Sequence, residues 1–257
     1  MRLIVLIILL VSNVFAYGDK LKVGVLQFAP PFSSKSDTSN HYYGFVIELM
    51  ATVCQRMQAE CEFVAIPKNG ELSGLDQKVF DITFTPNPMS SLLPESYLYS
   101  LPYLPSNGQF LTLKTNSINT VDDIKRKKIG FYKINFQEAP VLNKYNDTNT
   151  FVEFTDPAEL ISALMNKKID VILINHYAAH YIVTTVGRST NSNLMLIGDK
   201  MPIGNGYGII SLKTNAPLID KINQTLLDME KDGTYLTIYN EYFGSNPTYG
   251  HTTPHHQ

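Results

Sequence analysis

The 257-residue sequence lacks an excess of basic residues, and this absence excludes one large class of function. It contains 21 Lys and Arg residues against 23 Asp and Glu residues, so the formal net charge at pH 7 is −2. Domains that bind nucleic acid neutralise phosphates with clustered Lys and Arg and are usually strongly basic. We therefore expect no nucleic-acid partner.

Long apolar runs are also missing, apart from one at the N-terminus. Arg2 precedes the nine-residue apolar run Leu3–Val11, and Val14-Phe15-Ala16 has the small-residue pattern of a signal-peptidase site. A membrane span needs roughly 20 apolar residues, and no Cys follows the run to accept a lipid. We predict that residues 1–16 are a cleaved signal peptide, which places the mature protein in the periplasm. The alternative is a signal anchor that stays in the membrane.

Cysteine is scarce, since only Cys54 and Cys61 occur. In an oxidising space outside the cytoplasm, such a pair usually forms a disulfide. The pair has neither CxxC spacing nor nearby His residues, which are typical of redox and metal sites. We therefore expect a structural disulfide.

No convincing motif for a metal, a phosphate group or a catalytic triad is present. The glycine-rich stretch 204–208 is followed by no helix of the phosphate-binding type. His176 and His180 lie four residues apart on a predicted helix, and two-ligand chelation is the alternative to a structural role, but no third ligand is near. The polar tail 245–257 is predicted to be disordered, with adventitious metal binding by its His residues as the alternative. We expect no cofactor and no metal site.

The first part of the chain has an alternating strand and helix pattern. Residues Leu21–Val25 predict a strand, and apolar residues repeat at helical spacing from Val46 to Met57. Residues Cys61–Ile66 predict a second strand. A strand, a helix and a second strand in this order are typical of a parallel α/β sheet.

A second α/β set follows and the chain then returns to helices. Residues 128–132, 151–154 and 170–174 predict strands, the last being nearly continuously apolar, as in a sheet covered on both faces. Asp156 predicts a helix start as its N-cap. Strands at 108–113, 195–197 and 206–211 and helices at 177–186, 218–229 and 234–243 complete the prediction.

The stretch Asp81–Tyr103 is expected to form a wall of a ligand site. A short strand at 82–85 breaks at Pro86 and Pro88, because strand interiors exclude proline. Ligands of open α/β sheets bind beyond the carboxyl ends of strands. The alternative is an ordinary proline-rich connection.

Several separate segments resemble one protein family. LKVGV, PPFSSK, GF before a helix, CQRMQAEC, YSLPY and DGTYLTIYNEYFG look like the amino-acid-type periplasmic solute-binding proteins of ABC importers, nearest to the branch that binds lysine, arginine, ornithine or histidine. The match runs from about Leu21 to Gly244. It implies the type II periplasmic-binding-protein fold, with two α/β lobes joined by a two-segment hinge. Residues 17–106 and 201–244 would form lobe 1, and residues 107–200 lobe 2.

The resemblance also implies partners and a site. The partners would be a small-molecule solute and an ABC permease in the inner membrane, and the protein would be a monomer without enzymatic activity. Family members hold an amino acid with an arginine for its carboxylate, an aspartate for its ammonium and a stacked ring. Here the arginine position falls on Leu93 and the aspartate position on Asn175. No Lys or Arg occurs between Lys78 and Lys114.

Other anchors differ as well. An aspartate often used for basic side chains falls on Leu26, and the ring position falls on Ala29, next to Phe28. The family's carboxylate-binding turn reads Ile134-Asn135-Phe136. Because burying an unpaired ion costs several kcal/mol, these changes disfavour a plain basic amino acid as the solute. The predicted ligand-binding residues are Phe28, Lys68, Thr85, Pro86, Asn87, Leu93, Asn135, Phe136, Gln137 and Asn175.

Some alternatives stay open at this point. Lys68 would either anchor an anionic group or lie in solvent. The protein would either deliver an amino-acid-like solute to an importer or act as a sensor outside transport. An enzyme that resembles cyclohexadienyl dehydratase is disfavoured, because Leu93 and Asn175 remove the groups such chemistry needs.

Overall fold

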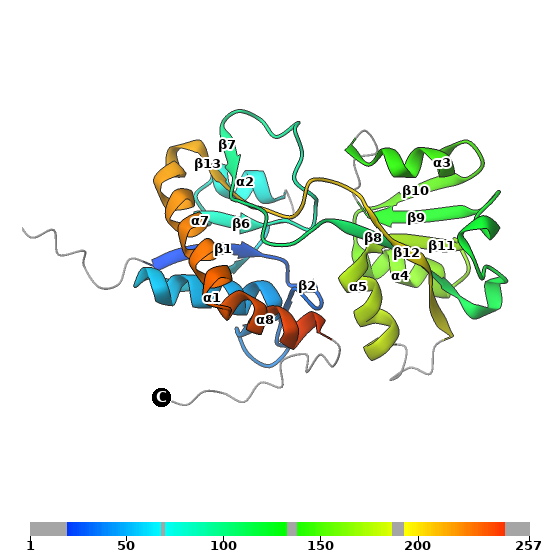
Figure 1. Cartoon of the computed structure of the whole chain (residues 1–257), viewed down its shortest axis with the longest axis horizontal. Coiled ribbons are helices and arrows are strands. Elements are labelled where there is room, and N and C mark those ends of the chain that lie inside the picture. The colour runs from blue at the N-terminus through cyan, green and yellow to red at the C-terminus, as the bar shows by residue number, and fades with distance from the viewer. Residues whose placement is uncertain (1–19, 68–69, 133–137, 187–192, 245–257) are drawn as a thin grey trace, which may run out of the picture.

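The computed structural model describes residues 20–67, 70–132, 138–186 and 193–244, and shows two α/β lobes side by side (Figure 1). The predicted signal peptide, the predicted tail 245–257 and four predicted site residues, Lys68, Asn135, Phe136 and Gln137, lie outside the described residues. Among the described residues, no helix is both long and apolar enough to cross a membrane.

The first lobe contains a five-stranded sheet with the order β5-β1-β6-β13-β7. Strands β5, β1 and β6 run parallel, whereas β13 runs antiparallel to both β6 and β7, between which it lies. The sheet therefore joins segments from both ends of the described chain. Its strands are β1 (Lys20–Val25), β5 (Glu60–Ala65), β6 (Ile82–Phe84), β7 (Tyr97–Tyr99) and β13 (Ile209–Leu212).

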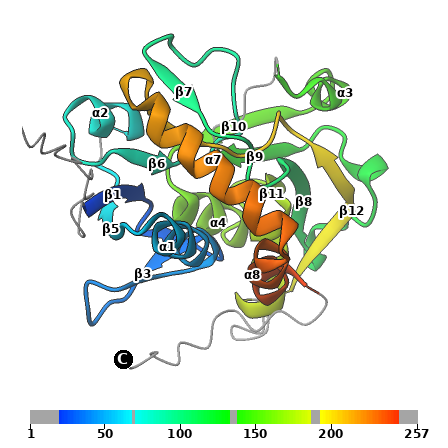
Figure 2. The same ribbon diagram turned by 60° about the vertical axis from the view of Figure 1, so that its left-hand side comes forward.

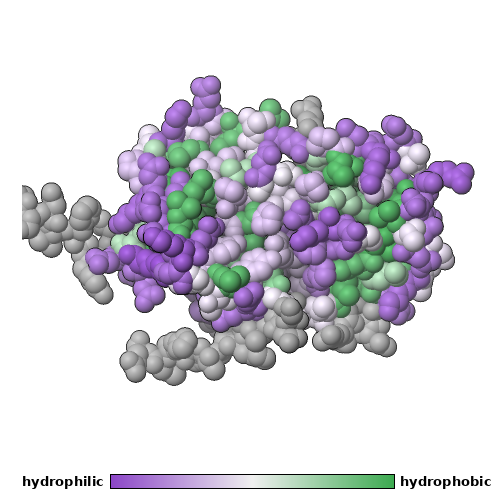
Figure 3. All heavy atoms as spheres, in the orientation of Figure 1, coloured by the Kyte–Doolittle hydropathy of each residue, from purple (hydrophilic) through white to green (hydrophobic). Residues whose placement is uncertain are grey.

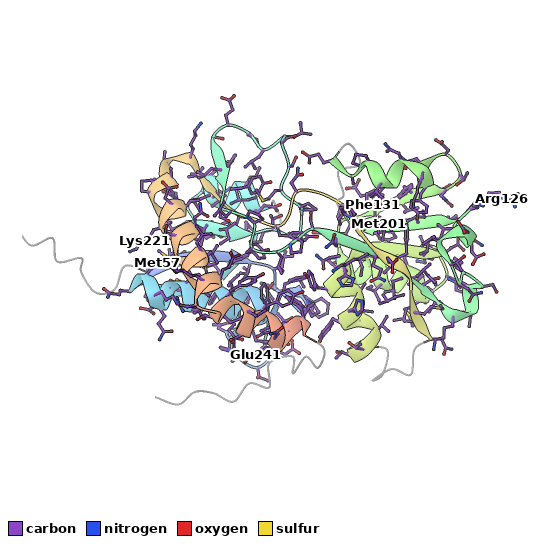
Figure 4. The ribbon with its side chains drawn as sticks, viewed as in Figure 1. Met57, Arg126, Phe131, Met201, Lys221 and Glu241 are labelled. Carbon is purple, nitrogen blue, oxygen red and sulfur yellow. A yellow bond between two sulfur atoms is a disulfide. The ribbon has the colours of Figure 1, made fainter. Side chains whose placement is uncertain are left out.

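Two long helices pack on this sheet, and a third packs against both of them (Figure 2). They are α1 (Phe45–Met57), α7 (Ala216–Lys231) and α8 (Thr234–Phe243). The stripe predicted from Val46 to Met57 is buried in α1. Lys221 of α7 donates from Nζ to the carbonyl oxygen of Met57 at 3.3 Å, and both residues are labelled in Figure 4. The two helices are thus tied by a hydrogen bond as well as by apolar packing.

The predicted disulfide between Cys54 and Cys61 is present, with a Cα–Cα distance of 5.9 Å. It connects the last turn of α1 to the beginning of β5. Between them, α1 ends at Gln58 in the left-handed conformation, and the N–H of Ala59 donates to the carbonyl oxygen of Cys54. The disulfide therefore fixes a tight reversal from helix to strand.

We expect the Cys54→Ala, Cys61→Ala double variant to lose about 2–3 kcal/mol of unfolding free energy, the loop-closure entropy of so short a loop. Urea unfolding followed by circular dichroism measures this. Adding a reductant should bring the unmodified protein to the stability of the double variant and leave the variant unchanged. Equal stability of both proteins without reductant would contradict the prediction.

The second lobe contains a sheet with the order β10-β9-β11-β8-β12. Its strands are β8 (Asn107–Leu113), β9 (Lys128–Tyr132), β10 (Thr150–Phe154), β11 (Val171–Asn175) and β12 (Leu194–Pro202), and its helices are α3 (Asn143–Asn146), α4 (Pro157–Met165) and α5 (His176–Tyr181). Asp156 caps α4 as predicted, accepting hydrogen bonds from the N–H groups of Ala158 and Glu159. Phe131 and Met201, labelled in Figure 4, lie in the core of this lobe.

Some local elements differ from the prediction. A small sheet that was not predicted is formed by β2 (Phe28–Ala29), β3 (Ser33–Lys35) and β4 (Tyr42–Tyr43). A six-residue helix, α2 (Glu71–Asp76), precedes β6. The helix predicted at 177–186 becomes π-helical from Ile182 to Val186, after α5. Short 3₁₀ turns lie at 114–116, 121–123, 140–142 and 213–215.

Two segments cross between the lobes, before β8 and after β12 (Figure 1). They contact each other, because Leu104 and Tyr207 form an isolated antiparallel bridge and Ile203 donates from its N–H to the carbonyl oxygen of Ser106 at 2.9 Å. Helix α8 supports the crossing, since the Tyr235 hydroxyl donates to the carbonyl oxygen of Tyr103 at 2.6 Å. The predicted fold class is confirmed, while the residue limits of the lobes remain a prediction.

An aromatic cluster joins the lobes beside this hinge. Tyr177 of α5 belongs to the second lobe, yet it packs into the core of the first. Its ring lies 4.2 Å from that of Phe243 and 6.4 Å from that of Phe32, centroid to centroid. On the outer face, by contrast, hydrophilic residues are interspersed with apolar patches on both lobes (Figure 3).

Candidate functional site

A cavity of about 370 Å³ lies between the lobes and takes its walls from both. Its volume falls within the range of small-molecule sites. Aromatic, aliphatic and proline side chains predominate on its walls, and no charged residue lines it among the described residues. The lining residues are Leu26, Phe28, Ala29, Pro30, Phe32, Ser33, Val46, Phe84, Thr85, Pro86, Pro88, Tyr103, Tyr132, Pro157, Ala158, Leu160, Ile161, Ile174, Asn175, Ala178, Tyr181, Ile182, Ile203 and Tyr207.

The structure brings four of the predicted ligand-binding residues to this cavity: Phe28, Thr85, Pro86 and Asn175. They come from β2, from the loop after β6 and from the end of β11. Phe28 lines the cavity while 63% of its surface stays exposed, so part of its ring is at the mouth. The loop after β6 forms part of the wall, as expected for the carboxyl end of a parallel strand.

Leu93 is not brought to the cavity. Its side chain packs against the buried cluster of Leu75, Phe80 and Ile210, beneath the first-lobe sheet. The prediction placed a residue at this sequence position near the solute because an arginine reaches the ligand from there. An apolar side chain has no reason to extend toward a carboxylate, and Leu93 is instead partly buried against this cluster.

The Thr85 side chain connects the cavity wall to a carboxylate. Its hydroxyl donates to Oε1 of Glu71 at 3.3 Å, and Nδ2 of Asn87 donates to the same oxygen at 3.3 Å. The Asn87 side chain does not line the cavity, and its Oδ1 is buried without a hydrogen-bond partner among the described residues. Glu71, Thr85 and Asn87 are hereafter called the Glu71 corner. It places two acceptor oxygens behind the wall.

The backbone of the loop after β6 has little capacity to hold a carboxylate. Pro86 and Pro88 have no N–H group, and the N–H groups of the six other residues from 87 to 93 are already donated. Their acceptors are Oγ1 of Thr85 for Asn87, the Gly206 carbonyl for Met89, the Tyr99 hydroxyl for Ser90, Oε1 of Glu138 for Ser91, Oγ of Ser90 for Leu92 and the Ser90 carbonyl for Leu93.

Asn175 has a structural role in addition to lining the cavity. It is the N-cap of α5, where its Oδ1 accepts hydrogen bonds from the N–H groups of Tyr177 at 2.8 Å and Ala178 at 3.3 Å. A hydrogen bond from its side chain partly offsets the effect of burial on Tyr207, whose pKa rises to about 12. The amide therefore orients the start of α5 and one tyrosine of the wall.

The titratable groups of the wall are neutral near pH 7. Burial raises the pKa of the Tyr132 hydroxyl, and the negative charges of Glu71 and Asp156 raise it further. Glu71 belongs to the first lobe and Asp156 to the second, so the negative charge that acts on the Tyr132 hydroxyl comes from both lobes. Burial also raises the pKa of Tyr103 well above its usual range.

The comparisons with known proteins decide the family. A family model described as bacterial extracellular solute-binding proteins, family 3, matches residues 21–245. The chain belongs to this family. A crystal structure of an arginine 3rd transport system periplasmic binding protein from Legionella pneumophila is 33% identical, with a TM-score of 0.79, and the match covers 87% of this chain and 99% of that one.

Two curated relatives come from Escherichia coli K12. The L-cystine-binding protein TcyJ is 29% identical over 89% of this chain and 84% of its own length. The ABC transporter arginine-binding protein 1 is 26% identical over 95% of this chain and 99% of its own length. All three relatives are named as binding proteins, which agrees with the prediction that this family 3 protein is not an enzyme.

In this family 3 protein, a direct contact spans the cleft away from the hinge. The N–H and the hydroxyl of Ser91, in the loop after β6, donate to Oε1 of Glu138 at 2.5 and 2.7 Å. Ser91 precedes β7 of the first lobe, and Glu138 follows β9 of the second. The contact requires the lobes to approach each other at this point.

His176 and His180 lie beside the site without forming a metal centre in the described part of the chain. Nδ1 of His176 is 2.8 Å from Oε1 of Gln109, and the two imidazole rings are 4.4 Å apart. Burial, with contributions from His180 and Lys200, lowers the pKa of His176 to about 4, so it is neutral at pH 7. No group of three or more His, Cys, Asp or Glu residues that could hold a metal is found among the described residues.

The sequence reasoning missed Glu71. The only available signal was its place in the first turn of a short helix, after the glycine N-cap Gly70. Acidic residues are common there because they interact favourably with the helix dipole. Its proximity to Thr85 depends on the pairing of β6 with β1, which no local pattern reveals.

Proposed function

We propose that this family 3 protein is the periplasmic solute-binding component of an ABC importer. It captures a small amino-acid-like solute, or a derivative of one, other than a plain basic amino acid. The two lobes close on the solute and present it to an ABC permease in the inner membrane. The protein acts as a monomer after cleavage of residues 1–16, with lobe limits at residues 106 and 200.

The observation that carries this proposal is the cavity between the lobes. Both lobes supply its walls, so a solute there favours their closed arrangement by contacting both. No charged side chain lines it among the described residues, whereas a zwitterion is held most strongly by paired charges. The names of the relatives include arginine and cystine, and the walls described above differ from a site built around two ion pairs.

A thermal-shift screen of the mature protein tests the proposal. The panel contains amino acids, amides, amines, short peptides and organic acids, each at a concentration far above a micromolar dissociation constant. A ligand at a hundredfold excess over its dissociation constant stabilises the protein by about 2.7 kcal/mol. This corresponds to roughly 5–10 °C in Tm for a chain of this size.

The expected result is a shift of this size with at least one amino-acid derivative and none with arginine, lysine or histidine. A comparable shift with arginine would contradict the proposed solute class while leaving a binding function intact. If no compound of the panel shifts the melting temperature, the result would contradict the binding function itself.

A further inference from the structure

The chemistry around the cavity is asymmetric, because it offers acceptors and negative charge but few groups that could hold an anion. Behind the cavity wall, the Glu71 corner contributes a carboxylate oxygen and the Oδ1 of Asn87, which is buried without a hydrogen-bond partner in the described part of the chain. Across the cleft, Asp156 adds a second negative charge near Tyr132. Of the described residues that line the cavity, none is Lys, Arg or His.

Among the described residues of the first-lobe wall, no cationic side chain is available to bind a carboxylate. Between Lys78 and Lys114 the sequence contains no cationic residue. From Pro86 to Leu93 each backbone N–H is either absent or already donated, and the side chain of Leu93 packs against the buried cluster of Leu75 and Phe80. A carboxylate placed here would lose its hydration without gaining donors, and would lie near two like charges.

An organic ammonium group suits the same surroundings. An ammonium has only donors, and the wall residue Thr85 is backed by the carboxylate of Glu71, to which its hydroxyl donates. Aromatic rings attract cations through their faces, and Phe28, Phe32, Tyr132 and Tyr181 all line the cavity. The remaining walls are mainly aliphatic, which favours an apolar body between the cationic group and the far end of the cavity.

We propose that the cavity selects an amine without a carboxylate group, an organic cation with an apolar body, and that Glu71 determines this preference. The inference rests on the proposed function and narrows its solute class to decarboxylated amino-acid derivatives and similar amines. The ammonium group lies on the Thr85 side of the cavity, where the Glu71 carboxylate is hydrogen-bonded to Thr85.

Matched compounds test the preference by isothermal titration calorimetry on the mature protein. One set shares a phenyl body: 2-phenylethylamine has the ammonium only, phenylalanine has both charges, and 3-phenylpropanoate has the carboxylate only. Agmatine and arginine form a second set, which differs in the carboxylate. The amine of a set is expected to bind at least about tenfold more tightly than its amino acid, and the carboxylate not measurably.

The variant Glu71→Gln removes the charge but keeps an acceptor oxygen for Thr85 and Asn87. It is expected to weaken amine binding about tenfold or more while the melting temperature without solute stays unchanged. Glu153→Gln is the matched control, because Glu153 is exposed on β10 and outside the cavity. It should bind amines as the unmodified protein does.

The outcomes separate this inference from the function on which it rests. Equal binding of amine and amino acid, or unchanged amine affinity in Glu71→Gln, would overturn the role of Glu71 and leave the binding function standing. The inference is also wrong if both sets fail to bind while another compound of the thermal-shift panel does. If nothing in either experiment binds, it is the proposed function that fails.

Discussion

Replacing Ala178 by tryptophan is expected to weaken solute binding about a hundredfold while leaving the fold intact. Ala178 lies on α5 and lines the cavity from the second lobe. A large ring there occupies much of a cavity of about 370 Å³ and obstructs closure of the first lobe on the solute. Calorimetric titration with the solute that gives the largest thermal shift measures the loss, which corresponds to about 2.7 kcal/mol.

The control for this variant is His180→Trp, on the same helix but exposed and outside the cavity lining. It should bind the solute normally. Because the chain contains no tryptophan, each variant has a single indole whose fluorescence reports its surroundings. Emission at shorter wavelength from Ala178→Trp than from the control would show that the new ring enters the cavity. Full binding by Ala178→Trp would contradict the assignment of the cavity as the solute site.

Replacing Phe45 by alanine is expected to give the largest loss of stability. Phe45 is fully buried at the start of α1, and its ring lies 4.8 Å from that of Phe243 and 5.9 Å from that of Tyr242, centroid to centroid. Removing a buried Phe side chain costs about 3–5 kcal/mol, since transfer and cavity terms add. Thermal unfolding should show a decrease of roughly 10 °C in Tm.

Phe28→Ala is a matched control for stability, because it makes the same chemical change at a residue that is 63% exposed. Its melting temperature without solute should stay within about 2 °C of the unmodified protein, as is usual for surface substitutions. Equal losses in the two variants would show that the aromatic cluster around α8 contributes little. In Phe45→Ala, faster hydrogen exchange of α8 amides would locate the loss in that cluster.

Much of the fold could be predicted because its main elements carry strong local signals. The apolar stripe of α1 reflects burial on one face of the helix, and the apolar run of β11 reflects burial on both faces of the sheet. The start of α4 is marked by its N-cap Asp156. The sheet of β2, β3 and β4 could not be predicted in the same way. Its strands have two or three residues, too few for any periodicity to appear.

The site was harder to predict than the fold. The position of a residue in the sequence indicates where its backbone lies, but it does not show in which direction the side chain points. Thr85 follows β6 and Asn175 ends β11, and the carboxyl ends of both strands meet at the cleft, so the positions of these two residues could be inferred. Leu93 lies further along the loop after β6, and its apolar side chain packs against the buried cluster of Leu75 and Phe80 instead. Glu71 acts through hydrogen bonds to residues 14 and 16 positions away, a relation that exists only after β6 has paired.

The position of β13 also determines the order in which the two lobes can be completed. The second-lobe sheet uses only strands from the continuous segment Asn107–Pro202, so all of it is available before β13 has been synthesised. In the first lobe, β7 has no neighbour in its sheet other than β13. A growing chain therefore begins the first lobe early and finishes it last. A fragment that ends before Ile209 leaves β6 with an unpaired edge, and such edges favour aggregation.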